Sequence, residues 1–251
     1  MTLSRSAAPL AVWPAVLMLL ATDAALAGSA ADVPTPVFEQ GEAAAGLKFG
    51  QARLRNGSRD AELELSVGHA VTSRWYSELK GLWAKPPGQR RDFDAWAWEN
   101  KFLLTKAGPF AFDLALSFEV ARPQDRSAGY GLSWGPQLQA RLNEHLQANL
   151  NLQFSKAVRT SQGGPVELSY SWQLKHDWRP EAEFGLQGLG ELGPWRDWSP
   201  AARQAHVAGP ALFGSLKLNE HQVINLNGAW LFGLGQGAPR HTLRVAAELA
   251  F

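Results

Sequence analysis

Charged side chains recur at two-residue spacing in the first half of the chain, and this spacing limits the chemistry that they could perform. Glu62 and Glu64 stand two positions apart, as do Glu78 and Lys80. In a β-strand, residues i and i+2 project from the same face, so the members of each pair would lie side by side. Carboxylate and ammonium groups gathered on one face order water and attract polar or charged solutes.

Following the same phase along the chain assigns a larger set of charged residues to one polar, inward face. Acids gather in the first half, whereas the second half carries mainly Arg and Lys. In one interpretation the two groups face each other across water and set up a transverse field, and in the other they pair and fill the interior. The candidate lumen-lining residues are Glu62, Glu64, Glu78, Lys80, Glu99, Lys101, Asp113, Glu119, Arg141, Lys175, Lys217, Arg244 and Glu248.

Residues suited to covalent or metal chemistry lack partners at a matching spacing. His69, His176, His206 and His241 fall on strands or near their ends, but none has a serine at a matching position within a few residues. Ser171 points inward by phase, on the opposite side of the wall from His176. The chain contains no cysteine, and no cluster of residues has metal-ligand spacing. We therefore expect no catalytic residue, no metal and no cofactor.

The elements that would position these charges are segments of about ten residues in which apolar and polar residues alternate. A membrane-crossing strand that is tilted needs this length. Twelve such segments are recognised, at 46–55, 60–71, 75–85, 93–105, 110–121, 128–141, 146–157, 167–178, 183–192, 205–217, 222–233 and 241–251.

The composition of the two faces favours lipid over water outside the strands. Segment 110–121 is the most regular, with Phe112 and Leu114 on one face and Asp113 on the other. The polar faces are rich in Gln, Asn, Ser and Gly, and charged residues are 19% of the chain. A soluble β-sandwich, the alternative, would carry more charge on its outer faces. Because a sheet in lipid cannot leave an open edge, we predict an all-β, closed antiparallel up-and-down transmembrane β-barrel of twelve strands.

The lengths of the connections agree with this topology. Connections from even to odd segments are short, for example 72–74 and 143–145, whereas most connections from odd to even segments are long, such as 193–204. Outer-membrane barrels have short periplasmic turns and longer external loops. The first connection, 56–59, is short and is an exception.

The last segment carries a family resemblance. Leu243, Val245 and Phe251 share its apolar face, and Arg244 and Glu248 lie opposite. A strand that ends on an aromatic residue resembles the last strand of Gram-negative outer-membrane β-barrel proteins, and the resemblance implies an outer-membrane location. It also implies recognition of the ending at Phe251 by the barrel-assembly machinery.

Two internal stretches extend the resemblance. Residues 93–105 (FDAWAWENKFLLT) and 179–187 (RPEAEFGLQ) resemble an uncharacterised proteobacterial family of outer-membrane proteins of about twelve strands. That family has no established activity, so the resemblance implies fold and location without chemistry.

The N-terminus has the features of an export signal. Arg5 precedes an apolar stretch, and Ala25-Leu26-Ala27 is a small-x-small cleavage site, so residues 1–27 are predicted to be a signal peptide. We expect 28–44 to be a periplasmic lead-in and 45–251 to be the barrel. Lys plus Arg number 24 and Asp plus Glu 23, a balance that indicates no nucleic-acid partner. Eleven Trp residues suit a boundary with outer-membrane lipid.

These features support three functional hypotheses. The first is a narrow passive channel, or porin-like transporter, for small polar solutes. The second is a closed barrel with a structural or surface-binding role, for which Trp195, Arg196 and Trp198 in the longest loop are the candidate contacts. The third is a lipid-modifying outer-membrane enzyme, which the lack of a Ser–His pair disfavours. Twelve strands lie between barrels filled by side chains and wide porins.

Overall fold

The computed structural model describes residues 28–106, 111–161, 163–179 and 181–251. A short 3-10 helix, η1 (Arg126–Ala128), lies between β5 and β6. Within the described residues no helix is both long and apolar enough to cross a membrane. The strands are β1 (Ala43–Arg53), β2 (Arg59–Thr72), β3 (Trp75–Lys85), β4 (Asp92–Thr105), β5 (Phe112–Pro123), β6 (Tyr130–Arg141), β7 (Leu146–Val158), β8 (Glu167–Arg179), β9 (Ala182–Pro194), β10 (Ala205–Lys217), β11 (Val223–Gly233) and β12 (His241–Ala250).

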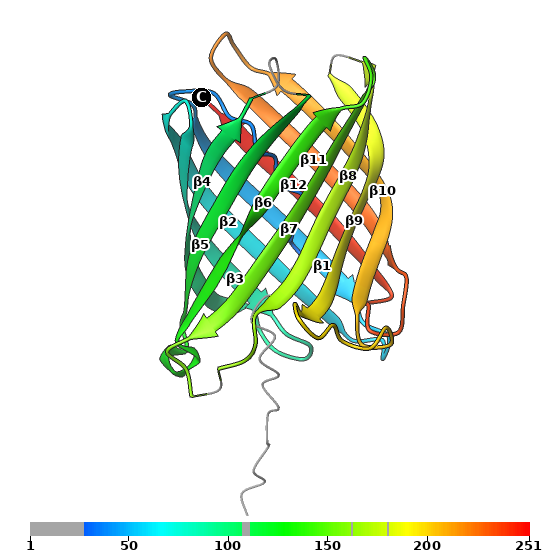
Figure 1. Cartoon of the computed structure of the whole chain (residues 1–251). Helices are drawn as coiled ribbons and strands as arrows, with labels where there is room; N and C mark the ends of the chain where they lie inside the picture. Colours follow the sequence, from blue (N-terminus) through cyan, green and yellow to red (C-terminus); the bar gives the residue numbers. More distant parts are fainter. Residues whose placement is uncertain (1–27, 107–110, 162, 180) are drawn as a thin grey trace, which may run out of the picture.

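The strands form a single closed sheet in which each one pairs antiparallel with its neighbours in sequence. Closure is made by β1 and β12, whose register runs from Ala44 opposite Ala250 to Arg53 opposite His241. Two backbone hydrogen bonds between Ala43 and Phe251 extend this ladder to the last residue. Figure 1 shows the strands tilted around the barrel, with the C-terminus at one end. The predicted closed, antiparallel, twelve-stranded all-β fold is confirmed.

The predicted strand positions agree closely with the structure, and the largest difference is at the start. β1 begins at Ala43 and not at residue 46, because residues 43–45 pair with β2 and residues 44 and 45 also pair with β12, although this Ala-rich sequence has no alternation. The expected beginning of the fifth segment at residue 110 falls outside the described residues, and β5 begins at Phe112. The predicted signal peptide, 1–27, also lies outside the described residues.

Apolar side chains cover the outside of the barrel and polar side chains are buried within it. On β7, Leu150 is 48% exposed, whereas the adjacent Asn149 and Asn151 are 3% and 5% exposed. The same inversion recurs around the sheet, where Leu65, Trp98 and other large apolar residues are exposed. Because one closed sheet has no second sheet to shield these residues, the soluble sandwich alternative does not describe this chain.

The short connections include two turns of the same chemistry, at Leu142–Leu146 and Leu218–Gln222. The backbone N–H of His145 donates to the side-chain oxygen of Asn143 at 2.9 Å, and His221 donates to Asn219 in the same way at 2.9 Å. Asn favours such turns because its side chain bonds the backbone two residues further on. Both turns join an even strand to the next odd strand, so they lie at the same end of the barrel as the C-terminus.

Candidate functional site

The interior of the barrel contains a cavity of about 730 Å³. Its lining includes Asp94 and Ala84, which lie near the strand ends at the side of the long connections. It also includes Glu181 and Glu248, which lie at the side of the short turns. The cavity therefore has lining residues near both ends of the barrel.

Residues 28–42, called here the internal segment, run through this interior. The Ser29 hydroxyl donates to the carbonyl of Gly50 on β1 at 3.2 Å, and the N–H of Ala30 donates to the Glu62 carboxylate on β2 at 3.2 Å. A Cβ at Gly50 would lie 1.8 Å from the carbonyl oxygen of Ser29, so only glycine admits the segment this close to the wall. At the other end, Phe38 packs on Tyr76 with ring centroids 5.6 Å apart.

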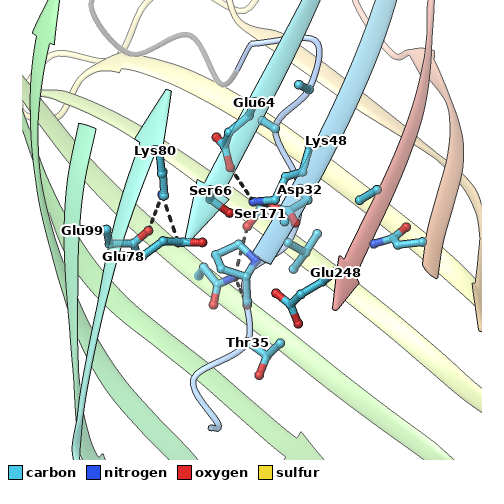
Figure 2. Close-up of a pocket in the computed structure, with 18 of the residues that line it drawn as sticks. Asp32, Thr35, Lys48, Glu64, Ser66, Glu78, Lys80, Glu99, Ser171 and Glu248 are labelled. Carbon is cyan, nitrogen blue, oxygen red and sulfur yellow. Dashed lines mark hydrogen bonds and ion pairs between the residues drawn. The ribbon is translucent and has the colours of Figure 1, made fainter. Parts of the chain in front are cut away.

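Strands distant from β1 also hold this segment. The Lys101 ammonium on β4 donates to the carbonyl of Thr35 at 2.7 Å, and the Asn151 amide on β7 donates to the carbonyl of Pro34 at 3.0 Å. The Arg244 guanidinium on β12 donates to the carbonyl of Ala31. We expected residues 28–44 to form a periplasmic lead-in. Residues 28–42 lie inside the barrel, where their backbone groups are bound by inward side chains on several strands. Figure 2 shows Asp32 and Thr35 of this segment among the strands.

Two lysines form ion pairs with the carboxylates on the acidic side of the cavity (Figure 2). Lys80 on β3 pairs with Glu99, with Glu119 at 2.9 Å and with Glu78 at 3.8 Å. Two of these carboxylates come from β4 and β5, so one ammonium links three adjacent strands. Buried charges need such partners, since an unpaired ion in the interior costs several kcal/mol.

Lys48 on β1 is the second of these lysines. It pairs with Glu64 on β2 at 3.0 Å and with Asp32 of the internal segment at 3.2 Å. Burial would raise the pKa of Asp32, but the positive charges of Lys48 and Arg244 outweigh it, and the pKa of this carboxyl lies below its ordinary value. Asp32 is therefore ionised near neutral pH and ties the segment to the wall.

The opposite wall is rich in amides. Gln187 on β9 is fully buried and donates to Gln173 on β8 at 2.5 Å, and it accepts from Arg244. Such side chains bind water or solute through both donors and acceptors. The buried polar side chains of β6–β9 are Gln137, Asn149, Asn151, Ser155, Ser169, Ser171, Gln173 and Gln187.

Most of the candidate lumen residues line the cavity. Of the others, Asp113 is buried on β5 and Arg244 is buried against the internal segment. Arg141 pairs with Asp177 near a short turn, and Lys217 is exposed at the end of β10. The candidates on the cavity lining are Glu62, Glu64, Glu78, Lys80, Glu99, Lys101, Glu119, Lys175 and Glu248.

The transverse field, one of the two interpretations of the sequence, does not match the distribution of charge. Of the four basic candidates in the second half, only Lys175 lines the cavity, and it pairs with Glu183 at 2.5 Å. Sequence reasoning also missed Lys48, Asp32 and Asp94. Lys48 was missed because its inward neighbours on β1 are small, which hides the alternation. Asp32 lies in a segment without periodicity.

The candidate surface-loop residues follow β9. Trp195 packs edge-on against Phe154, with centroids 5.9 Å apart, and the Arg196 guanidinium lies 5.0 Å from the centre of the Trp195 ring. Trp198 is 58% exposed. Trp195 and Arg196 thus contact the chain itself, and Trp198 is more exposed than Trp195, which is 43% exposed.

His206 and His176 have neutral or aromatic neighbours. His206 lies 2.9 Å from the hydroxyl of Tyr170 and 2.9 Å from the side-chain oxygen of Gln204. His176 stacks between His145 and Phe184. Among the described residues, no group of three or more His, Cys, Asp or Glu side chains could hold a metal ion.

The geometry offers ion pairing and hydrogen bonding to a solute inside the barrel.

A closed barrel with this polar interior has the architecture of outer-membrane porins. The structure is similar to that of the NanC porin, with a TM-score of 0.57 and 10% identity over 82% of this chain and 98% of that one. It is also similar to the KdgM porin in complex with disordered oligogalacturonate, with a TM-score of 0.53 and 9% identity over 83% of this chain and 98% of that one.

A third similar structure is the transport unit of the autotransporter AIDA-I from Escherichia coli. Its TM-score is 0.51, with 9% identity over 85% of this chain and 90% of that one. At these identities the likeness concerns the fold. No protein-family model matches the sequence, and no curated protein matches it.

Proposed function

We propose that this chain is an outer-membrane channel through which small hydrophilic solutes diffuse. The observation that carries the proposal is the polar cavity of about 730 Å³, whose lining residues come from near both ends of the barrel. The exposed apolar belt supports a membrane location, because large apolar side chains on every side of a barrel are stabilised by lipid. The proposal includes export of the chain through an N-terminal signal peptide.

The internal segment limits the width of the channel. Residues 28–42 occupy part of the interior and contact β1, β2, β4, β7 and β12, so the free path is narrower than the barrel. A narrow path lined by charges and amides suits solutes of a few heavy atoms and excludes large ones.

Planar-bilayer recording of the purified full-length chain tests the proposal. We expect discrete unitary currents in potassium chloride, with a conductance well below that of a sixteen-stranded porin. Protein that migrates as a folded, heat-modifiable barrel on a gel and yet carries no unitary current would contradict an open channel.

A closed barrel with a structural role is the second candidate, and the position of residues 28–42 favours it. A variant that lacks residues 30–40 distinguishes the two, because the strand ladder of the barrel closes through β1 and β12 without this segment. In the channel proposal, the full chain conducts and the deletion raises the unitary conductance several-fold. If only the deletion variant conducts, the full-length protein is a closed barrel.

A further inference from the structure

The charge balance of the cavity lining is strongly negative. The basic side chains on the lining are four lysines, and Arg244, buried beside the internal segment, adds a fifth positive charge. Carboxylates outnumber them about two to one. The eleven acidic residues on the lining are Asp32, Glu42, Glu62, Glu64, Glu78, Asp94, Glu99, Glu119, Glu181, Glu183 and Glu248.

Acidic partners already engage most of the lysines. Lys80 contacts three carboxylates, Lys48 contacts two, and Lys175 contacts Glu183. The ammonium of Lys101 donates to the carbonyl of Thr35. The lining therefore has little positive charge left for an anionic solute.

Five carboxylates on the lining have no basic side chain within 4.0 Å among the described residues, and they occur toward both ends of the barrel. Glu62 and Asp94 lie near the strand ends at the side of the long connections. Glu42, Glu181 and Glu248 lie at the side of the short turns. Acidic groups at both ends of a pore concentrate cations at each entrance.

Hydrogen-bonding capacity on the lining is also biased toward acceptors. The side-chain oxygens of Gln137, Asn151 and Asn227 are enclosed and have no hydrogen-bond donor among the described residues. Gln137 is 3% exposed and Asn151 is 5% exposed, and all three residues line the cavity. A buried amide oxygen without a donor is costly, so rotation of these side chains toward the cavity would be favoured when a solute with N–H groups supplies that donor.

We infer that the channel selects small organic cations with several N–H donors, such as diamines and guanidinium compounds, over anions of similar size. The inference rests on the proposed channel function and adds the class of solute. The cation compensates the unpaired carboxylates, and its N–H groups satisfy the amide oxygens of Gln137, Asn151 and Asn227 when these side chains turn toward the cavity.

The reversal potential of single channels in a potassium chloride gradient tests the charge preference. We expect potassium to permeate at least about fivefold better than chloride, as local counter-ion concentration rises in an acidic pore. Millimolar putrescine should reduce the potassium current, whereas citrate at the same concentration should not. The variant Glu181→Gln with Glu248→Gln should lower the permeability ratio, and Glu144→Gln, in an exposed turn, should leave it unchanged.

A second measurement probes the lumen without a current. The chain has no cysteine, so single cysteines can be introduced at Ser133, on the cavity lining, and at Ser161, in an exposed connection. In lipid vesicles, a cationic methanethiosulfonate should modify Ser133→Cys faster than an anionic one. The ratio of the two rates should exceed that at Ser161→Cys by at least about fivefold.

The outcomes separate the two proposals. A folded protein with no current and no modification at Ser133→Cys would contradict the channel itself, and the selectivity with it. A current with equal or greater chloride permeability would overturn only the cation preference. Equal rate ratios at the two cysteines would overturn it as well.

Discussion

At the scale of single residues, Lys80 connects three strands through its ion pairs. Its ammonium pairs with carboxylates from three adjacent strands, and its side chain is only 11% exposed. Ion pairs of this kind add little net stability compared with an apolar replacement of both partners, but removal of one partner leaves the other charge uncompensated. Loss of the lysine is therefore far more damaging than loss of one of its carboxylates.

We predict that Lys80→Met lowers the free energy of unfolding by about 3 kcal/mol, because it leaves Glu78, Glu99 and Glu119 close together without a cation. Urea titration followed by tryptophan fluorescence in lipid vesicles measures the change. Lys217→Met, at an exposed position, is the matched control and should change the free energy by about 0.5 kcal/mol or less.

Removal of the repulsion should rescue the variant. Lys80→Met combined with Glu99→Gln and Glu119→Gln is expected to recover most of the lost stability, since two of the three charges disappear. A combined variant no more stable than Lys80→Met alone would show that the lysine acts through packing and not through charge.

At the scale of elements, the ends of the sheet determine closure. β12 pairs with β1 along its whole length, and the backbone of Phe251 continues the pairing with bonds of 2.8 Å and 2.9 Å to Ala43. The Phe251 side chain is 53% exposed and contributes little to that ladder. The backbone and the ring of this residue thus have separable roles.

We predict that Phe251→Ala lowers the level of protein in the outer membrane several-fold in cells, because the terminal ring is the feature that resembles the assembly signal. Refolding of the purified variant into detergent should be unchanged, since the backbone bonds to Ala43 remain. Immunoblots of membrane fractions and a heat-shift gel measure the two effects. Val245→Ala, on the same outward face, is the control, and equal membrane levels of the two variants would argue against recognition of the ring.

At the scale of the whole molecule, the barrel has a polar interior and an apolar exterior. Residues in the middle of β7 face the two environments, with Leu150 on the outside and Gln153 on the cavity lining. A charge is costly in lipid and is tolerated in a hydrated lumen. The proposed membrane location therefore makes opposite predictions for these two positions.

We predict that Leu150→Arg destabilises the barrel in lipid vesicles by about 2–4 kcal/mol, the cost of arginine near the bilayer midplane. Gln153→Arg should cost less than about 1 kcal/mol, because the side chain remains in the polar cavity. Urea unfolding of both variants gives the comparison. Equal losses, or a greater loss at Gln153, would mean that the exposed apolar face does not lie in lipid.

Local patterns were sufficient for the closed topology and for most strands and their phase, and β1 is the exception. The two faces of a strand differ at adjacent residues, as Leu150 and Asn151 do. Outward and inward positions therefore alternate in the sequence with a period of two residues. The turn at Asn143 and the short connections also depend on residues close in sequence, so they too could be predicted from the sequence.

The position of residues 28–42 and the partners of each charge depended on the tertiary structure. The contact of Asn151 with Pro34 joins residues 117 positions apart, and that of Arg244 with Ala31 joins residues 213 apart. No periodicity encodes such contacts, because they arise only when closure brings β7 and β12 around the same interior. The unequal charge of the cavity is decided in the same way, since it depends on which lysines and carboxylates meet across strands and not on their order in the chain.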